Sequence, residues 1–299
     1  MGGKCKKKRN WKEINEKYVR EGELWIDEEA LREWWKKVTK KNRNKVGSPF
    51  TYPDEFMTFG GIVKTLFHLG LRQLEGFLKL IKRFSQFPKA PDYTTLSRRI
   101  PELPWEDLPH TPWKKPIIIA QDSTGLKVAQ YGDWMRRKWK VHRGFLKLHV
   151  SVNVKNHEVL GVRVTDERAA DSAQFSSLIE QSRQKGRIGK CLADGAYDTN
   201  ACFGVLERER IAPGIRLRKT ASCRDGTRLR RREVRLRRRL GSQDAWRNEK
   251  DFGQRWQVES VYGAFKRRFG EAVSSKSFDG MVREVLRKAW VYNWLVRLC

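Results

Sequence analysis

The chain has 299 residues, with 64 lysines and arginines against 35 aspartates and glutamates, and a formal net charge of +29. A surplus this large repels itself unless a polyanion neutralises it, so nucleic acid is the leading partner. A membrane surface is the competing partner, but the sequence shows no basic amphipathic helix, lipidation signal or apolar run long enough to span a bilayer.

The cysteines and the first residues bear on the compartment. The five cysteines are scattered, with no CxxC pair and none near a histidine at zinc-ligand spacing, so we interpret them as reduced thiols. The charged start of the chain is followed by a polar helix rather than an apolar signal core. We therefore expect a cytoplasmic protein associated with the nucleoid.

Residues 1–100 are predicted to form a helical DNA-binding region. A basic arm at residues 4–9 is either a solvated tail or a phosphate-contacting arm. Two helices joined at Gly70 and a short third helix suit a helix-turn-helix-like DNA reader, and an ordinary helical bundle is the alternative. Arg98 and Arg99 near the end of the third helix are candidate DNA contacts. The expected helices run from Asp27 to about Lys40, from Asp54 or Thr58 to about Leu69, from Leu71 to Phe84 and from Tyr93 to Arg99.

Prolines mark residues 101–115 as a linker, and after it the pattern changes to strands. Three antiparallel-type strands, a helix, a strand, a helix and a strand follow in order. This order predicts a ribonuclease-H-like α/β domain over residues 116–299, in which helices flank a mixed sheet. The expected elements are Pro116–Asp122, Phe145–Val154, Val159–Thr165, the helix Asp171–Lys185, Ile188–Asp194, the helix from Thr199 to about Arg210, and Ile211–Leu217.

An arginine-rich insertion lies between the last of these strands and the next helix, at about residues 218–250. It holds nine arginines between Arg224 and Arg239. We interpret it as a segment that contacts DNA phosphates and becomes ordered on binding, in preference to a merely solvated face. Its candidate DNA contacts are Arg230, Arg231, Arg237 and Arg238.

The stretch from Asp251 to Gly270 is predicted to form one helix. Phe252, Arg255, Glu259 and Lys266 are separated by 3, 4 and 7 positions, which places them on one face at about 100° per residue. The opposite side carries an apolar stripe of Trp256, Val258, Val261, Tyr262, Phe265 and Phe269. Alone, the charged face is either a solvated surface with helix ion pairs or a metal-binding carboxylate beside two phosphate-binding cations.

Two further carboxylates favour the second interpretation. Asp122 and Asp194 each end a predicted strand, and side chains at strand ends of an α/β sheet converge. Together with Glu259 they would supply three oxygen donors, which suit Mg²⁺ or Mn²⁺, and a pair of such ions supports phosphoryl transfer. Asp198 is interpreted as a helix N-cap and His149 as a polar sheet residue rather than as part of this set.

These motifs resemble the DDE-type transposases of insertion sequences, and more narrowly the insertion sequence 5 family. The resemblance covers nearly the whole chain. The matching residues are QDSTG at Gln121–Gly125, ADGAYD at Ala193–Asp198, the Arg255, Glu259 and Lys266 spacing, and, earlier in the chain, Trp11-Lys12-Glu13, LWIDEEAL at Leu24–Leu31, LRQLEGF at Leu71–Phe77 and PDYTTLSRR at Pro91–Arg99.

The resemblance implies a specific activity. It implies a divalent metal pair held by Asp122, Asp194 and Glu259, with Arg255 and Lys266 holding DNA phosphates. It also implies binding of double-stranded terminal inverted repeats, DNA cleavage, transfer of the 3′ ends into target DNA, and a homodimer or higher oligomer in a synaptic complex. Phe252 departs from the tyrosine usual at that position. This departure keeps a catalytically silent DNA-binding relative as an alternative, and a nuclease on the same fold is a further alternative.

Overall fold

The computed structural model describes residues 10–22, 33–85, 87–128 and 145–298, and the basic arm predicted at residues 4–9 lies outside them. The chain divides into two compact units, one of residues Met1–Leu103 with Trp294–Cys299 and one of residues Pro104–Asn293. Among the described residues no helix is long and apolar enough to cross a membrane.

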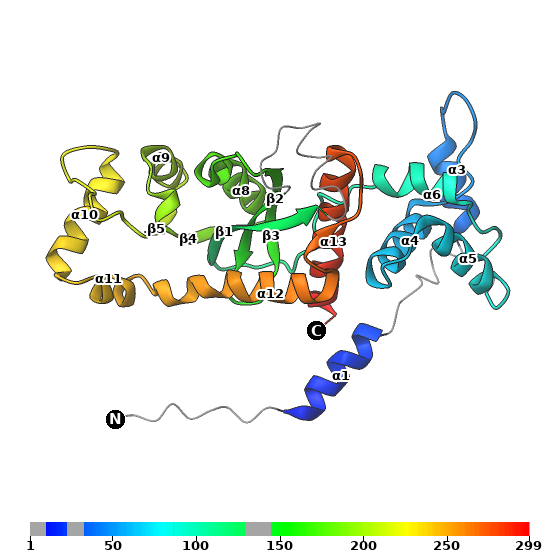
Figure 1. The fold of residues 1–299 in the computed structure, drawn as a ribbon, viewed down its shortest axis with the longest axis horizontal. Coiled ribbons are helices and arrows are strands. Elements are labelled where there is room, and N and C mark those ends of the chain that lie inside the picture. Colours follow the sequence, from blue (N-terminus) through cyan, green and yellow to red (C-terminus); the bar gives the residue numbers. More distant parts are fainter. Residues whose placement is uncertain (1–9, 23–32, 86, 129–144, 299) are drawn as a thin grey trace. The chain divides into compact units, whose positions relative to one another are not determined.

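The first unit is helical (Figure 1). Trp34, Phe56 and Phe87 form its centre, with ring centroids 5.0 Å apart for Trp34–Phe56 and for Phe56–Phe87. The predicted break at Gly70 separates two of its helices, and Asp92 caps the last one by accepting from the Thr95 amide at 2.6 Å. Its helices are α1 (Trp11–Gly22), α3 (Trp34–Asn42), α4 (Asp54–Leu66), α5 (Leu71–Lys82), α6 (Tyr93–Arg99) and the 3₁₀ turn η1 (Ile100–Glu102).

The second unit is built on a mixed sheet in the order β3-β2-β1-β4-β5, with β6 paired to β1. β1 is antiparallel to β2 and parallel to β4 and β6, β2 is antiparallel to β3, and β4 is parallel to β5. This order with these directions is a ribonuclease-H-like sheet, which confirms the predicted fold class. The strands are β1 (Ile117–Val128), β2 (Phe145–Asn153), β3 (Val159–Asp166), β4 (Ile188–Ala193), β5 (Ala212–Ile215) and β6 (Ala272–Val273).

Helices cover both faces of this sheet. Figure 1 shows α8 and α9 on one side and α12 on the other. A Cβ at Gly161 of β3 would lie 2.9 Å from the Leu178 carbonyl of α8, so glycine is what lets α8 approach the sheet this closely. The remaining elements are α8 (Asp171–Lys185), η2 (Gly195–Tyr197), α9 (Asn200–Arg208), α10 (Arg228–Leu240), α11 (Gln243–Glu249), η3 (Phe252–Trp256), α12 (Gln257–Phe269) and α13 (Phe278–Arg297).

Strand β1 is longer than the sequence predicted. The expected strand ended at Asp122, but β1 continues to Val128 because residues 119–127 pair with β2 and the last two pair with β6. Asp122 therefore lies in the middle of a strand, and the prediction that it ends one is wrong. Its neighbour Gln121 still pairs with Ala193 of β4, which keeps Asp122 beside the end of that strand.

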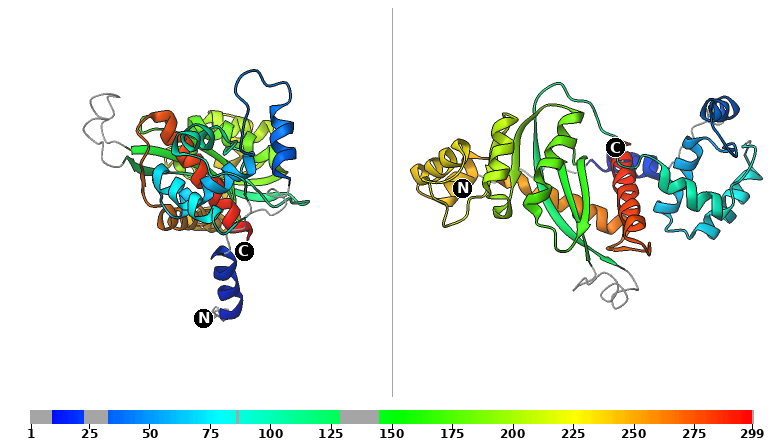
Figure 2. Two further views of the ribbon diagram at one scale, coloured as in Figure 1. Left: turned by 90° about the vertical axis from the view of Figure 1, so that its right-hand side faces the viewer. Right: turned by 90° about the horizontal axis from the view of Figure 1, so that it is seen from above.

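The arginine-rich insertion contains two helices, and its ordering on DNA binding stays a prediction. It forms α10 and α11, which Figures 1 and 2 show beyond the β5 edge of the sheet. Thr227 caps α10 by accepting from the Arg230 amide at 3.2 Å, and Leu229 and Val234 are buried against the sheet core. Local capping and apolar burial therefore both stabilise these helices.

A buried glutamate of α13 gives the fold a pH dependence. Glu284 accepts from the amides of Ser274 and Ser275 at 3.0 and 2.9 Å and pairs with Lys288 at 2.9 Å, which fastens α13 to the end of β6. Burial opposes ionisation of this carboxyl, but Lys288 and the Ser275 hydrogen bonds outweigh burial and lower its pKa from 4.5 to about 2.

This depressed pKa predicts acid sensitivity. Because the folded pKa lies below the unfolded one, the stabilisation is complete above about pH 4.5 and is lost as pH falls towards 2. The contribution of ionised Glu284 to the free energy of unfolding corresponds to about 3 kcal/mol. Denaturant titrations of wild type and Glu284→Gln between pH 7 and pH 3 should show the wild type losing stability more steeply than the variant. Parallel pH profiles for the two proteins would contradict the assignment.

Candidate active site

Two aspartates lie side by side at the middle of the sheet. The last paired residues of the parallel strands β1 and β4 are Gln121 and Ala193, and Asp122 and Asp194 follow them directly. Asp194 leaves β4 at the start of η2, where its Oδ1 accepts from the Ala196 amide at 2.9 Å. The convergence that the sequence predicted for these two positions thus follows from the strand register.

Arg255 connects the sheet to α12. Its Nη1 donates to Oδ2 of Asp122 at 2.9 Å, and its Nη2 donates to Oε1 of Glu259 at 2.8 Å. The Tyr262 hydroxyl, one turn further along α12, donates to the Asp122 carbonyl at 2.7 Å. Glu259 is therefore held towards Asp122 through a shared guanidinium, although the two residues are far apart in sequence.

The Asp122 carboxyl sits in an environment that disfavours its charge. Burial raises its pKa, and the nearby Asp194 adds to the rise, while the Ser123 amide and the Arg255 guanidinium oppose it. A positive charge close to Asp122 would counter this rise in pKa by favouring the ionised form. Arg255 supplies part of that charge.

The donor set fits a hard divalent cation, because all three candidate ligands are carboxylates. Within the part of the chain that the structure describes, however, no three histidine, cysteine or acidic side chains gather closely enough to hold a metal ion. The structure brings Asp122 to Asp194 and Asp122 to Glu259, but it does not arrange all three around one centre. Arg255 occupies one oxygen of Asp122 and one of Glu259.

The helix that carries Glu259 begins differently from its prediction. Residues 252–256 form the 3₁₀ turn η3, and the α-helix α12 begins only at Gln257. Residues three apart eclipse in a 3₁₀ turn, and the Arg255 guanidinium lies 5.9 Å from the centroid of the Phe252 ring. Phe252 is only 7% exposed and packs on Trp246, with ring centroids 5.3 Å apart. Trp256 was expected in the buried stripe and is instead 57% exposed, whereas Val258, Val261, Tyr262, Phe265 and Phe269 are buried as predicted.

Comparison with known families assigns the chain. A family model described as a transposase DDE domain matches residues 113–294, more than half of the sequence. The chain belongs to the DDE transposase family. A second transposase DDE domain model matches residues 19–131. Neither match singles out the insertion sequence 5 family, so that narrower assignment stays a prediction.

Individual similar proteins are distant. An uncharacterised protein of Aquifex aeolicus (strain VF5) is 27% identical over 290 residues, covering 89% of this chain and 84% of that protein. The piggyBac transposase in a synaptic complex with hairpin DNA is 8% identical, with a TM-score of 0.42, covering 94% of this chain and 74% of that chain. The Drosophila P element transposase in a strand transfer complex is 11% identical, with a TM-score of 0.30, covering 87% of this chain and 69% of that one.

A third solved structure is the intasome of simian T-cell lymphotropic virus in complex with a PP2A regulatory subunit. It is 16% identical, with a TM-score of 0.26, and covers 52% of this chain. The chain spans about half the length of that protein, with 51% covered. Because all three structural similarities are weak, the fold of this DDE transposase family member is assigned from its own strand order.

The residues of this DDE transposase family member that are predicted to contact DNA differ in their exposure and in whether they are already paired with a carboxylate. Arg98 and Arg238 are exposed, and Arg231, Arg237 and Lys266 are partly exposed. Arg99, by contrast, is buried and pairs with Asp54. Arg230 is also occupied, because it forms two hydrogen bonds with Asp198.

Asp198 is not the helix cap that the sequence suggested. Thr199 caps α9 by accepting from the Cys202 amide, while the buried Asp198 binds Arg230 at 2.7 Å and the Arg218 amide at 2.8 Å. An arginine-rich insertion thus reaches back to the residue just after the DGAY turn. No spacing rule reveals this pair, because its members are 32 positions apart.

Two tyrosines near the carboxylates were missed as site residues. The sequence pattern places Tyr262 only in the apolar stripe, yet its hydroxyl donates a hydrogen bond to the backbone carbonyl of Asp122. The Tyr197 hydroxyl is buried with no hydrogen-bond partner among the described residues, and burial, followed by Asp171, Asp122 and Asp194, raises its pKa. For Tyr262 the available signal was chemical, since a buried tyrosine hydroxyl usually finds a hydrogen-bond partner.

Proposed function

We propose that this protein is an active DNA transposase that cleaves at transposon ends and transfers the 3′ ends into target DNA. Asp122, Asp194 and Glu259 are its catalytic carboxylates. The observation that carries the proposal is the junction of β1, β4 and α12, where Asp122 lies beside Asp194 and shares Arg255 with Glu259. The family assignment supports the same reaction class.

The three carboxylates would together hold two divalent cations, either Mg²⁺ or Mn²⁺. Bound there, the ions would stabilise negative charge on the attacking and leaving oxygens of a phosphoryl transfer. The protein's own contribution is positional: adjacent strands fix the two aspartates, and Tyr262 holds the Asp122 backbone. Arg255 uses one N–H on each of two carboxylates, so its remaining N–H groups are available to a phosphate oxygen.

The substrates in this proposal are double-stranded terminal inverted repeats and target DNA, bound by a homodimer or higher oligomer in a synaptic complex. The net charge of +29 supports a polyanionic partner. Lys266, Arg231, Arg237, Arg238 and Arg98 are the proposed phosphate contacts. Arg99 and Arg230 are less suited, since each is already paired with a carboxylate.

The test is an assay with the inverted repeats that flank the gene. Purified protein, labelled duplex ends and a target plasmid should give nicked ends and joined product with Mg²⁺, and neither product with EDTA. Binding of the repeats without metal-dependent nicking would favour the silent relative. Nicking without any joined product would favour a nuclease.

The silent alternative rests on Phe252, which replaces the usual tyrosine. Because the Phe252 ring is buried against Trp246, we expect position 252 to make no essential DNA contact. Phe252→Tyr should therefore leave the cleavage rate essentially unchanged in the same assay. Cleavage that appears only in the Phe252→Tyr protein would instead identify the wild type as the silent relative.

A further inference from the structure

A hollow lined in part by Asp194 opens towards the arginine-rich insertion. Its volume is about 590 Å³. The segment after β5 forms one wall, and α10 with the start of α11 forms another. The lining residues are Asp194, Gly195, Arg216, Leu217, Arg218, Lys219, Arg237, Arg238, Gly241, Ser242 and Gln243.

The charge of this pocket is strongly one-sided. Five of its lining residues are cationic, namely Arg216, Arg218, Lys219, Arg237 and Arg238, and Asp194 is the one acid among the described residues that line it. Arg237 donates to the carbonyls of Leu217 and Arg218 at 3.2 and 2.9 Å, and Arg218 donates to the Gly195 carbonyl at 3.4 Å. None of the five is ion-paired with a carboxylate in the described part of the chain.

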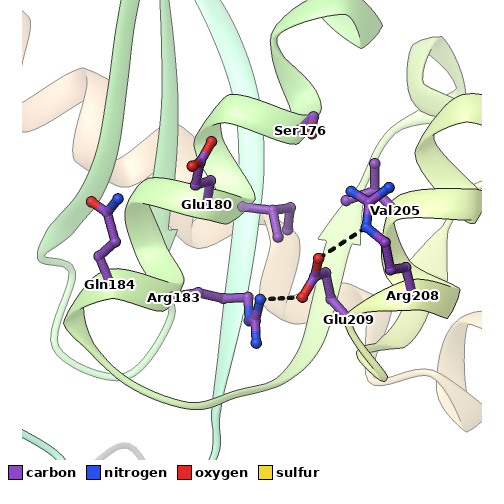
Figure 3. A pocket seen from close by; sticks show the side chains of 8 residues that line it. Ser176, Glu180, Arg183, Gln184, Val205, Arg208 and Glu209 are labelled. Atoms are coloured by element: carbon purple, nitrogen blue, oxygen red, sulfur yellow. Dashed lines mark hydrogen bonds and ion pairs between the residues drawn. The ribbon is translucent and has the colours of Figure 1, made fainter.

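In a different pocket of the same unit, the arginines are paired with a carboxylate. Between α8 and α9 lies a hollow of about 500 Å³, in which Glu209 pairs with both Arg183 and Arg208 (Figure 3). Glu180 adds a further carboxylate to that lining. Among the described residues the cations near Asp194 are in no such ion pair, so an anion bound from outside would reduce their mutual repulsion.

The pocket is also fixed in position relative to the candidate catalytic residues. Arg216 directly follows β5, and its amide donates to the Ala193 carbonyl at 3.0 Å, one residue before Asp194. Lys219 lies three residues further along the same wall. Neither side chain has a hydrogen-bond or ion-pair partner among the described residues, so both are available to a ligand.

We propose that this pocket binds the phosphates adjoining the reactive phosphate of a DNA strand. The strand would pass from the carboxylates over Asp194 into the pocket, where Arg216 and Lys219 contact consecutive phosphodiesters and Arg237 and Arg238 line the opposite wall. The position of the reactive phosphate rests on the proposed function. Binding of a DNA backbone by the pocket does not require it.

The first experiment measures binding alone. Arg216→Gln with Lys219→Gln is compared in full-length protein with wild type, using a short duplex of arbitrary sequence, no metal, and a series of salt concentrations. Removing one phosphate-binding cation should reduce the slope of log K against log salt by about 0.9, so the double variant should show a slope smaller by about 1.8. Its affinity near physiological salt should fall by about tenfold for each cation.

Arg183→Gln with Arg208→Gln is the matched control, because it removes two charges from the pocket of Figure 3. The control should keep the wild-type slope, and Arg216→Lys, which retains the charge, should keep most of the affinity. Melting curves identify any variant that fails to fold, and the exposed Arg216 and Lys219 make that outcome unexpected. An unchanged slope in the pocket variant, or an equally reduced slope in the control, overturns the proposal.

The second experiment locates the contact. Methylphosphonate replaces one phosphate at a time along the terminal-repeat duplex, which removes a single negative charge. Wild-type binding should weaken at one or two positions next to the cleaved bond, and the Arg216→Gln, Lys219→Gln protein should be insensitive at those same positions. Sensitivity that is unchanged by the mutations overturns the pocket, whereas a protein that binds in this way but never cleaves overturns only the proposed activity.

Discussion

Replacing Asp122 with asparagine is expected to slow cleavage at transposon ends by about a thousandfold. A bound divalent cation contributes several kcal/mol of transition-state stabilisation, and about 1.4 kcal/mol corresponds to a factor of ten in rate. Asparagine keeps the shape of the side chain and can still accept from the Ser123 amide, but it removes the charge. Single-turnover cleavage of a labelled repeat under saturating protein measures this step.

The control and the parallel variant sharpen this prediction. Asp244→Asn removes a carboxylate from a highly exposed position on α11 and should cleave at the wild-type rate. Glu259→Gln should lose activity to a similar extent as Asp122→Asn, because both are proposed ligands of the same ions. All three proteins should bind the repeat, so that the loss is in the chemical step. Cleavage that survives either active-site substitution would remove that carboxylate from the proposed metal site.

The sheet could be predicted because the pattern of apolar and polar residues in its strands reflects which side chains are buried. The alternation in Phe145–Asn153 and the short apolar run of β4 identify strands, and their order with the intervening helices specifies the fold class. The end of β1 could not be predicted, because Ser123, Thr124 and Gly125 look like a turn in isolation. They remain in a strand because the antiparallel strand β2 pairs with them.

Part of the geometry of the proposed site follows from the sequence. The positions of Asp122 and Asp194 follow from strand order, and the Arg255–Glu259 pair follows from helical spacing. The contact of Arg255 with Asp122 depends on how α12 crosses the sheet, which no local pattern encodes. The same limit applies to charge: Arg99 and Arg230 look like free cations in sequence, and only the fold supplies Asp54 and Asp198 as their partners.

Asp198 and Asp194 lie four residues apart in one motif, and mutation should separate their roles. The Asp198 side chain is 0% exposed and accepts two hydrogen bonds from Arg230 and one from the Arg218 amide. Asp198→Ala leaves the guanidinium of Arg230 largely buried without its counter-charge. Removing one partner of a buried ion pair costs about 3–5 kcal/mol, so this variant should show a clearly lower denaturant midpoint.

Asp194→Asn should give the opposite pattern, with a near wild-type midpoint and a loss of cleavage comparable to that of Asp122→Asn. Asp194 is partly exposed, and its Oδ1 contact with the Ala196 amide survives in asparagine. Replacing both Asp198 and Arg230 by apolar residues should recover part of the stability, because no unpaired charge then remains buried. If Asp198→Ala instead kept its midpoint and lost only cleavage, Asp198 rather than Asp194 would be the second metal ligand.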